Sequence, residues 1–444
     1  MQPANLQVSS LMKSTIHSKP ARALLILWGM LMVLAPARTS GQIPLPPELD
    51  RPRDGDMVAW IGDTFVEREP SYAYLETWLT TRFPNRAFRM RNLGWSADTV
   101  KCESRARFGT AKDGFEHLVN TLAVVKPTIV VLQYGTNDSQ AGAAGLQEFL
   151  SDYRRLISEI RGRFKPRQLF LATPMPPARL LSATADAARK KNLDLYAEAI
   201  RNLAPEVQAE VIDFNTAAAR IAARNEEEFR KISDNGVNLS NLGYWRLLST
   251  IDRDIFGFSE KPLKFRLTQD RDSVVTIPAS QSSIAFEFQT KPGTSSARFE
   301  IRRVQLPAPV APRASGDDRP GPAPGWMFQF PGLADGRYRL ELDGKPAATA
   351  SAKAWAEGIS VGEDPDAARV EQIRQHVMRK NELFFHRWRP QNETYLFGFR
   401  KHEQGNNAVE IPQFAPLVTQ AETEINKLKK PPVHTVTLVR EDQP

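Results

Sequence analysis

The chain has 444 residues, of which 41% are hydrophobic, so it is long enough for two or three domains and apolar enough for a packed core. Its formal net charge is +8, and four of the basic residues lie in the first 41 residues, which contain no acidic residue. The remaining charge is too small and too scattered to predict nucleic-acid binding. The single cysteine, Cys102, excludes an intramolecular disulfide and cysteine-rich zinc or haem sites.

Residues 1–41 have the organisation of a signal peptide. A basic segment, Lys13–Arg22, precedes a short apolar run, Ala23–Ala35, and a small-residue cleavage motif at Ala35-Pro36-Ala37, with a second candidate site at Thr39–Gly41. The apolar run is too short to favour a stable membrane span. We therefore predict an exported protein, periplasmic or extracellular, with no integral membrane span after cleavage; an uncleaved anchor is the alternative.

From residue 55 to 258 the chain alternates short apolar runs with amphipathic segments. Strands alternating with helices of this length predict a mostly parallel sheet covered on both faces, a three-layer α/β/α domain of flavodoxin-like type. The expected strands are Met57–Ile61, Ala87–Asn92, Thr128–Gln133, Gln168–Ala172 and Val207–Asp213. The expected helices are Ser71–Arg82, Gly114–Val125, Leu146–Arg163, Ala183–Asn202, Thr216–Phe229 and Leu242–Phe256.

Four polar segments follow predicted strands or close the domain. They are Gly62-Asp63-Thr64, Asn92–Val100, Tyr134–Ser139 and Ser233–Trp245. Each alone is typical of an ordinary loop, because Gly, Asn, Asp and Ser favour turns for conformational reasons. The carboxyl ends of parallel strands meet at one edge of the sheet, where α/β folds bind ligands. Four segments in this order therefore indicate a shared site that contains the Thr64 hydroxyl.

These segments resemble the sequence blocks of the SGNH (GDSL-type) hydrolase family. The corresponding residues are Gly62-Asp63-Thr64, Asn92-Leu93-Gly94, Gly135-Thr136-Asn137-Asp138 and Asn235-Gly236-Val237-Asn238, within Met57–Gly257. The resemblance implies ester hydrolysis by a serine nucleophile and a histidine base. It also implies an oxyanion site whose donors are the Thr64 N–H, the Gly94 N–H and the Asn137 amide; Asp63 and Asp138 belong to the same blocks.

The chain departs from this family pattern at the catalytic positions. Thr64 replaces the serine, Asn238 replaces the histidine and Asn235 replaces the orienting acid, although Asp234 is adjacent. An amide cannot accept a proton near neutral pH, so a hydroxyl beside Asn238 is not activated. The catalytic base is therefore missing from its expected position.

Two histidines in the C-terminal part are candidate alternative bases. His386 and His402 lie in a stretch rich in aromatic, arginine and amide side chains, a composition suited to a polar binding surface. The competing interpretation is a buried aromatic cluster with paired charges. Nothing in the sequence places either ring beside Thr64.

The remainder of the chain predicts two further parts. Residues 262–358 contain alternating, strand-like segments and a Pro/Gly-rich loop, Leu306–Gly325, and predict a β-sandwich-like accessory module. Residues 362–432 predict a helical and aromatic segment that packs on the α/β domain, with helices at Asp364–Lys380 and Phe414–Leu428.

Three functions are compatible with the sequence. The first is an exported esterase, acting on a small-molecule ester or an acylated carbohydrate with Thr64 as nucleophile. The second is an inactive domain that binds such a ligand, and the third is a structural component of an exported assembly. No motif implies a metal or a cofactor, and the sequence does not determine the oligomeric state.

Overall fold

The computed structural model describes most of the chain downstream of the predicted signal peptide. The predicted signal at residues 1–41 and the candidate residue Asp234 lie outside the described residues. Within the described part, no helix has both the length and the hydropathy needed to cross a membrane. The described ranges are 52–107, 109–176, 183–233, 235–256, 263–267, 275–276, 284–289, 296–303, 305–314 and 317–441.

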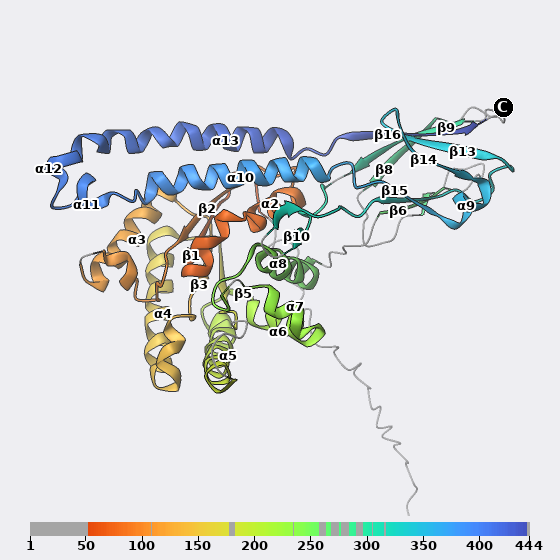
Figure 1. Ribbon diagram of the computed structural model, residues 1–444. Helices are drawn as coiled ribbons and strands as arrows, with labels where there is room; N and C mark the ends of the chain where they lie inside the picture. Colours follow the sequence, from red (N-terminus) through yellow and green to blue (C-terminus); the bar gives the residue numbers. More distant parts are fainter. Residues whose placement is uncertain are drawn as a thin grey trace, which may run out of the picture. The chain divides into compact units, whose positions relative to one another are not determined.

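Five parallel strands form the sheet of the α/β domain, in the order β2-β1-β3-β4-β5 (Figure 1). This is the flavodoxin-like order, in which the chain direction across the sheet reverses between β1 and β3. Every residue of β1 and β3 is buried, as expected for central strands covered on both faces. The strands are β1 Met57–Gly62, β2 Arg89–Gly94, β3 Ile129–Gln133, β4 Gln168–Ala172 and β5 Glu210–Ile212.

Helices cover both faces of this sheet, which confirms the predicted three-layer fold. One face packs against α3 Ala111–Val125, α4 Gly142–Phe164 and α5 Ala183–Glu206. The other packs against α1 Thr64–Arg68, α2 Tyr74–Arg82, α6 Phe214–Arg224 and α8 Asn241–Phe256.

Two local predictions in this domain were wrong. The charged turn expected after β1 is the short helix α1, because Asp63 Oδ1 accepts the Phe65 N–H at 3.0 Å and caps its first turn. The single helix expected over Thr216–Phe229 is two helices, α6 and α7 Glu226–Lys231. Asn225 separates them because its backbone is extended and its side chain accepts the Glu227 N–H.

The accessory module is a sandwich of two sheets, β15-β12-β6-β7 and β14-β13-β16-β9-β8. Aromatic side chains from both sheets, such as Phe265, Trp326 and Phe299, form a common core. A two-stranded ribbon, β10 Pro312–Ala314 with β11 Asp317–Pro320, lies in the predicted Pro/Gly-rich loop. The other elements are β6 Lys264–Leu267, β7 Val275–Thr276, β8 Ile284–Gln289, β9 Ser296–Arg303, β12 Trp326–Gln329, β13 Arg337–Leu342, β14 Lys345–Ser351, α9 Ala352–Glu357, β15 Ile359–Val361 and β16 Val433–Glu441.

The last strand, β16, returns to the centre of the larger sheet, between β13 and β9. The sequence-based expectation ended the folded C-terminal segment at residue 432 and did not include this strand. His434 in β16 is buried, with Nδ1 2.7 Å from Asp343 Oδ2 and Nε2 3.3 Å from Asp366 Oδ1. These two carboxylates raise the pKa of His434 against the opposing effect of burial. The helical segment is therefore an insertion between two strands of the sandwich.

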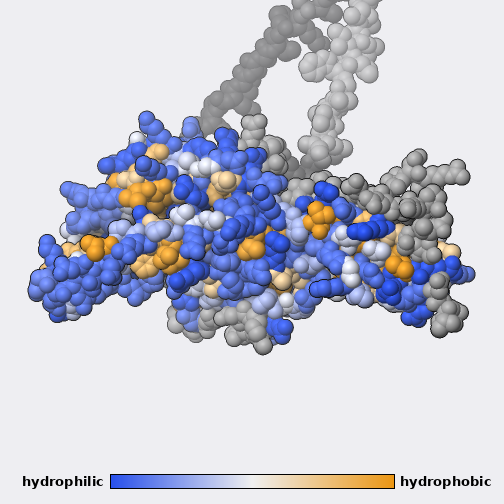
Figure 2. All heavy atoms as spheres, turned by 90° about the horizontal axis from the view of Figure 1, so that it is seen from above, coloured by the Kyte–Doolittle hydropathy of each residue, from blue (hydrophilic) through white to orange (hydrophobic). Residues whose placement is uncertain are grey.

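That insertion is an antiparallel pair of long helices, α10 Ala367–Trp388 and α13 Phe414–Leu428 (Figure 1). The aromatic stretch that was predicted to follow the first helix is in fact its last part, up to Trp388. Short helices α11 Glu393–Leu396 and α12 Lys401–Gln404 connect the pair. The outward face seen in Figure 2 is mostly hydrophilic, whereas Leu383, Phe384 and Val418 join the core of the α/β domain.

Candidate functional site

Thr64 lies where the sequence predicted, directly beyond the carboxyl end of β1 and at the start of α1. Its side chain is half-buried, and its Oγ1 accepts the Ala97 N–H at 2.9 Å. Ala97 points this N–H at Thr64 from a left-handed backbone conformation, with φ of 59°. Left-handed backbone is unfavourable for alanine, so the surrounding loop must hold it. A hydroxyl and a main-chain donor are thus brought together at the sheet edge.

The Gly94 N–H, predicted as an oxyanion donor, is already used by another group. It donates to Asn92 Oδ1 at 2.9 Å, inside the domain. Gly94 has a steric role instead, because a Cβ at this position would lie 2.1 Å from the Glu67 nitrogen. The donor that reaches Thr64 is three residues later, at Ala97. No sequence signal marks it, since the left-handed turn depends on the folded loop.

Asn137, after β3, is fixed against the residue that follows Ala97. Its Nδ2 donates to the Asp98 main-chain oxygen at 3.0 Å. The dipeptide Ala97-Asp98 therefore contacts Thr64 on one side and Asn137 on the other. Since β1 and β3 flank the point where the sheet order reverses, the site occupies the usual ligand position of this fold.

A buried ion pair supports this dipeptide from below, and sequence reasoning missed it. Arg105 is 1% exposed and its Nε lies 2.5 Å from Asp98 Oδ2, which also accepts the Tyr134 hydroxyl at 3.0 Å. Arg105 Nη2 donates to the Leu93 oxygen at 2.8 Å. Burial raises the pKa of Asp98, although the Arg105 charge opposes this shift. The network connects the ends of β2 and β3 through charge-assisted bonds.

The two other predicted acidic residues, Asp63 and Asp138, serve the backbone of the site. Asp63 caps α1, and burial raises its pKa to about 7. Asp138 accepts the Gly135 N–H at 3.0 Å and the Val100 N–H at 3.2 Å, and burial raises its pKa to about 6. Both therefore shape the loops around Thr64 and Asn137.

We expect protonation of Asp63 to stabilise the fold, because its folded-state pKa of about 7 exceeds its ordinary value of 3.8. This stability is present below pH 4 and is lost as the pH rises through 7. Asp63→Asn should therefore reduce the fall in unfolding free energy between pH 4 and pH 7, measured by urea denaturation. Asp138 contributes with the same sign, so part of the fall remains. Asp113→Asn is the control, since its pKa is lowered and titrates below this window; an equal effect of both substitutions would contradict the prediction.

The late block forms a turn ahead of α8. Asn235 Oδ1 accepts the N–H groups of Val237 and Asn238, at 3.0 and 2.8 Å. The Asn238 main-chain oxygen accepts the Ser233 hydroxyl at 2.6 Å. Asn235 therefore acts as a turn residue here. In the described part of the chain, the side chain of Asn238 makes no hydrogen bond to Thr64.

Neither candidate alternative base forms a hydrogen bond with Thr64. His386 is on α10, where its ring packs 5.7 Å from that of Phe414. His402 is exposed, with Nε2 3.7 Å from Glu403 Oε1. The structure thus leaves Thr64 with a main-chain donor as its hydrogen-bond partner and without a titratable partner among the described residues.

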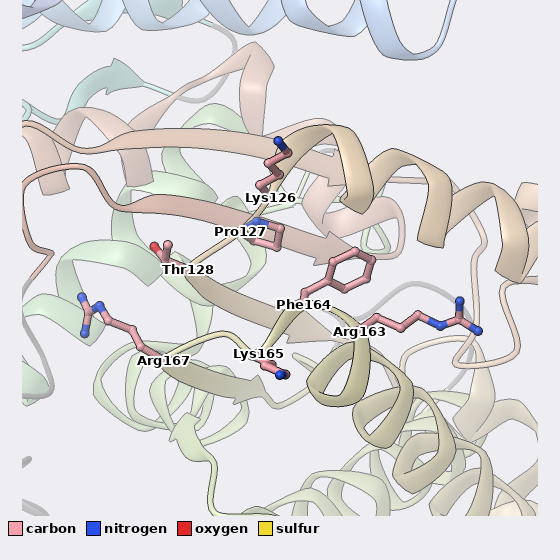
Figure 3. Close-up of a pocket in the computed structure, with 7 residues that line it drawn as sticks. All are labelled: Lys126, Pro127, Thr128, Arg163, Phe164, Lys165 and Arg167. Atoms are coloured by element: carbon pink, nitrogen blue, oxygen red, sulfur yellow. The ribbon is translucent and has the colours of Figure 1, made fainter.

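A cavity of about 350 Å³ lies elsewhere, at the amino ends of β3 and β4 (Figure 3). Thr128 and Arg167, which directly precede these strands, contribute to its wall. The cationic side chains point in different directions from it in Figure 3, and Arg167 is paired with Asp56. It is on the opposite edge of the sheet from Thr64 and is not the site described above. Within the described residues, no group of three or more His, Cys, Asp or Glu is placed to hold a metal ion.

A parallel sheet in flavodoxin-like order, with Thr64 and Asn137 at the reversal point, defines an SGNH-type α/β hydrolase fold. Residues 59–246 match the model of the GDSL-like lipase/acylhydrolase family, and the chain belongs to this family through that domain. Hydrolysis of acylated substrates is the chemistry of the family. No curated protein matches the chain.

Solved structures show the same fold. BT4096, a gut microbial diltiazem-metabolizing enzyme, is 16% identical with a TM-score of 0.64, over 88% of this chain and 99% of its own. That likeness extends beyond the α/β domain and concerns the fold alone. A catalytic mutant of the acetylxylan esterase Axe2 from Geobacillus stearothermophilus is 19% identical, with a TM-score of 0.37 over 47% of this chain and 97% of its own. LAE5, an alpha/beta hydrolase from the metagenome of Lake Arreo, is 19% identical, with a TM-score of 0.35 over 46% of this chain and 95% of its own.

Proposed function

We propose that the α/β domain binds a short acyl ester, such as an acylated carbohydrate, and hydrolyses it very slowly or not at all. The observation that supports this most strongly is the partner of Thr64, which is the Ala97 N–H and not a base. A threonine hydroxyl with no base nearby keeps its ordinary high pKa and is a weak nucleophile.

The same hydrogen bond favours binding. Because Thr64 Oγ1 accepts from Ala97, its own proton remains free to be donated to a ligand carbonyl oxygen. The Asn137 amide, held by the Asp98 oxygen, has a second N–H for the same purpose. Ser96 and Ala97, the exposed residues of the loop, are small or polar and fit a polar ester. Together with the export pattern of residues 1–41, this places the proposed binding function outside the cytoplasm.

We expect partially acetylated xylo-oligosaccharides to raise the thermal unfolding temperature of the protein, and their deacetylated counterparts to have no effect. Asn137→Ala should remove the stabilisation by the ligand, because it deletes one of the two proposed donors. Gln140→Ala, an exposed neighbour, is the control and should retain it. Equal shifts with acetylated and deacetylated sugars would count against recognition of the acyl group.

Hydrolysis is the second candidate, favoured by the placement of a hydroxyl and a main-chain donor at one point. Acetate release from the same oligosaccharides distinguishes the two functions. We expect release at the buffer background for both the native protein and Thr64→Ala. Release that Thr64→Ala abolishes would replace the binding proposal with an esterase.

A further inference from the structure

The end of α10 reaches the loop that contains Ala97. Arg389 is the residue that caps α10, and its Cζ lies 3.7 Å from the centre of the Trp95 ring. This is the distance of a close cation–π contact, and Trp95 is buried. Trp388, the last helical residue, meets the same ring edge to face at 5.9 Å. A C-terminal helix thus packs on a residue two positions before the donor to Thr64.

Arg389 also contacts the helix that begins with Thr64. Its Nη1 lies 2.5 Å from Glu67 Oε1, one turn along α1. The other carboxylate oxygen of Glu67 accepts the hydroxyl of Ser96, the residue before Ala97. A chain of charged and polar contacts therefore runs from Arg389 through Glu67 to Ser96. It connects α1 to the Trp95–Ala97 loop, the two segments that provide Thr64 and its donor.

This contact has a fixed origin because α10 is anchored to the α/β domain along its length. Lys380 is fully buried and its Nζ lies 2.8 and 2.6 Å from the two oxygens of Glu76. Arg374 Nη1 donates to the Tyr72 oxygen at 2.8 Å. In α13, Glu422 pairs with Arg91 of β2 at 2.6 Å. The helix pair is therefore a rigid support and can set the position of Arg389.

We propose that Arg389 is a positioning residue for the Thr64 site, which holds the Ala97 N–H towards the Thr64 hydroxyl through Trp95 and Glu67. The strained backbone of Ala97 needs such support, since alanine does not favour a φ of 59°. The role in geometry stands independently of the ligand. The consequence for ligand binding rests on the function proposed above.

Arg389→Met tests this, because it keeps the length of the side chain and removes the guanidinium. In protein labelled with ¹⁵N-alanine, we expect hydrogen exchange of the Ala97 amide to become at least tenfold faster. Amides of the β3 core, such as Val130 and Leu132, should be unchanged. Arg379→Met is the matched control, because Arg379 is an exposed α10 residue paired with Glu382. It should leave Ala97 exchange unchanged.

Two further variants keep the proposal testable. Arg389→Lys retains the charge beside Glu67 and should restore part of the protection of Ala97. Glu67→Gln breaks the ion pair from the other side and should accelerate Ala97 exchange even if Arg389→Met does not fold. Unchanged Ala97 exchange in Arg389→Met, or in Glu67→Gln when only that variant folds, would overturn the proposal.

Ligand binding is a separate measurement. If the native protein binds acetylated oligosaccharide, Arg389→Met should weaken the affinity about tenfold. Absence of binding by the native protein would refute the proposed function alone, and the exchange result would still decide the role of Arg389.

Discussion

Thr64→Ser, Asn235→Asp and Asn238→His combined are expected to give an esterase whose rate exceeds that of the native chain by about 10²- to 10⁴-fold, the usual contribution of general-base catalysis. The remaining parts of a nucleophilic site are present, since the residue-64 hydroxyl receives the Ala97 N–H and Asn137 lies next to it. The triple variant supplies the base, its orienting carboxylate and a less crowded hydroxyl. The measurement is kcat/KM for a short-chain aryl ester.

The aspartate at position 235 should preserve the turn, because its carboxylate can accept the N–H groups that Asn235 Oδ1 accepts now. Thr64→Ser alone is the control and should gain little, since the base is still missing. Asn137→Ala in the triple variant should remove most of the gain. A triple variant with the native rate would show that position 238 does not face the hydroxyl, and the assignment of the late block would then be wrong.

Lys380→Met is expected to lower the free energy of unfolding by about 3–5 kcal/mol, the usual loss when one partner of a buried ion pair is removed. Lys380 is 0% exposed and donates to both oxygens of Glu76 and to the Met90 oxygen. Burial lowers the pKa of Lys380, which the Glu76 charge opposes. Without the ammonium group, the Glu76 carboxylate stays buried beside α10 with its main partner gone. Urea denaturation followed by tryptophan fluorescence measures the loss.

The double variant Glu76→Gln/Lys380→Met should recover most of that stability, because it leaves no uncompensated buried charge. Arg379→Met, which breaks an exposed pair on the same helix, should change stability by less than about 0.5 kcal/mol. A loss in the double variant equal to that in Lys380→Met would attribute the effect to packing and not to charge.

The parallel sheet was predictable because its signal is local. Buried strands such as β1 and β3 are continuous apolar runs, and helices such as α4 repeat apolar residues at helical spacing. The position of Thr64 and Asn137 follows from the same signal, since residues after parallel strands share one edge. The bounds of α13 were likewise those that its apolar face indicated.

The donor at Ala97 could not be predicted, because its direction depends on a left-handed backbone that alanine does not favour. Similarly, β16 pairs with β9, a strand more than a hundred residues earlier, so nothing local marks His434 as buried. Lys380 and Arg389 have the composition of an exposed helix face, and their contacts with Glu76, Trp95 and Glu67 come from the distant α/β domain.

The sequence by itself determined the class of fold, the edge of the sheet that contains the site and the absence of histidine at position 238, since periodicity, strand ends and residue identity are properties of the linear chain. Only the tertiary structure decided which N–H meets Thr64 and that the C-terminal helix supports the loop beside it. These features depend on backbone conformation and on contacts between segments some 300 residues apart, which local sequence does not encode.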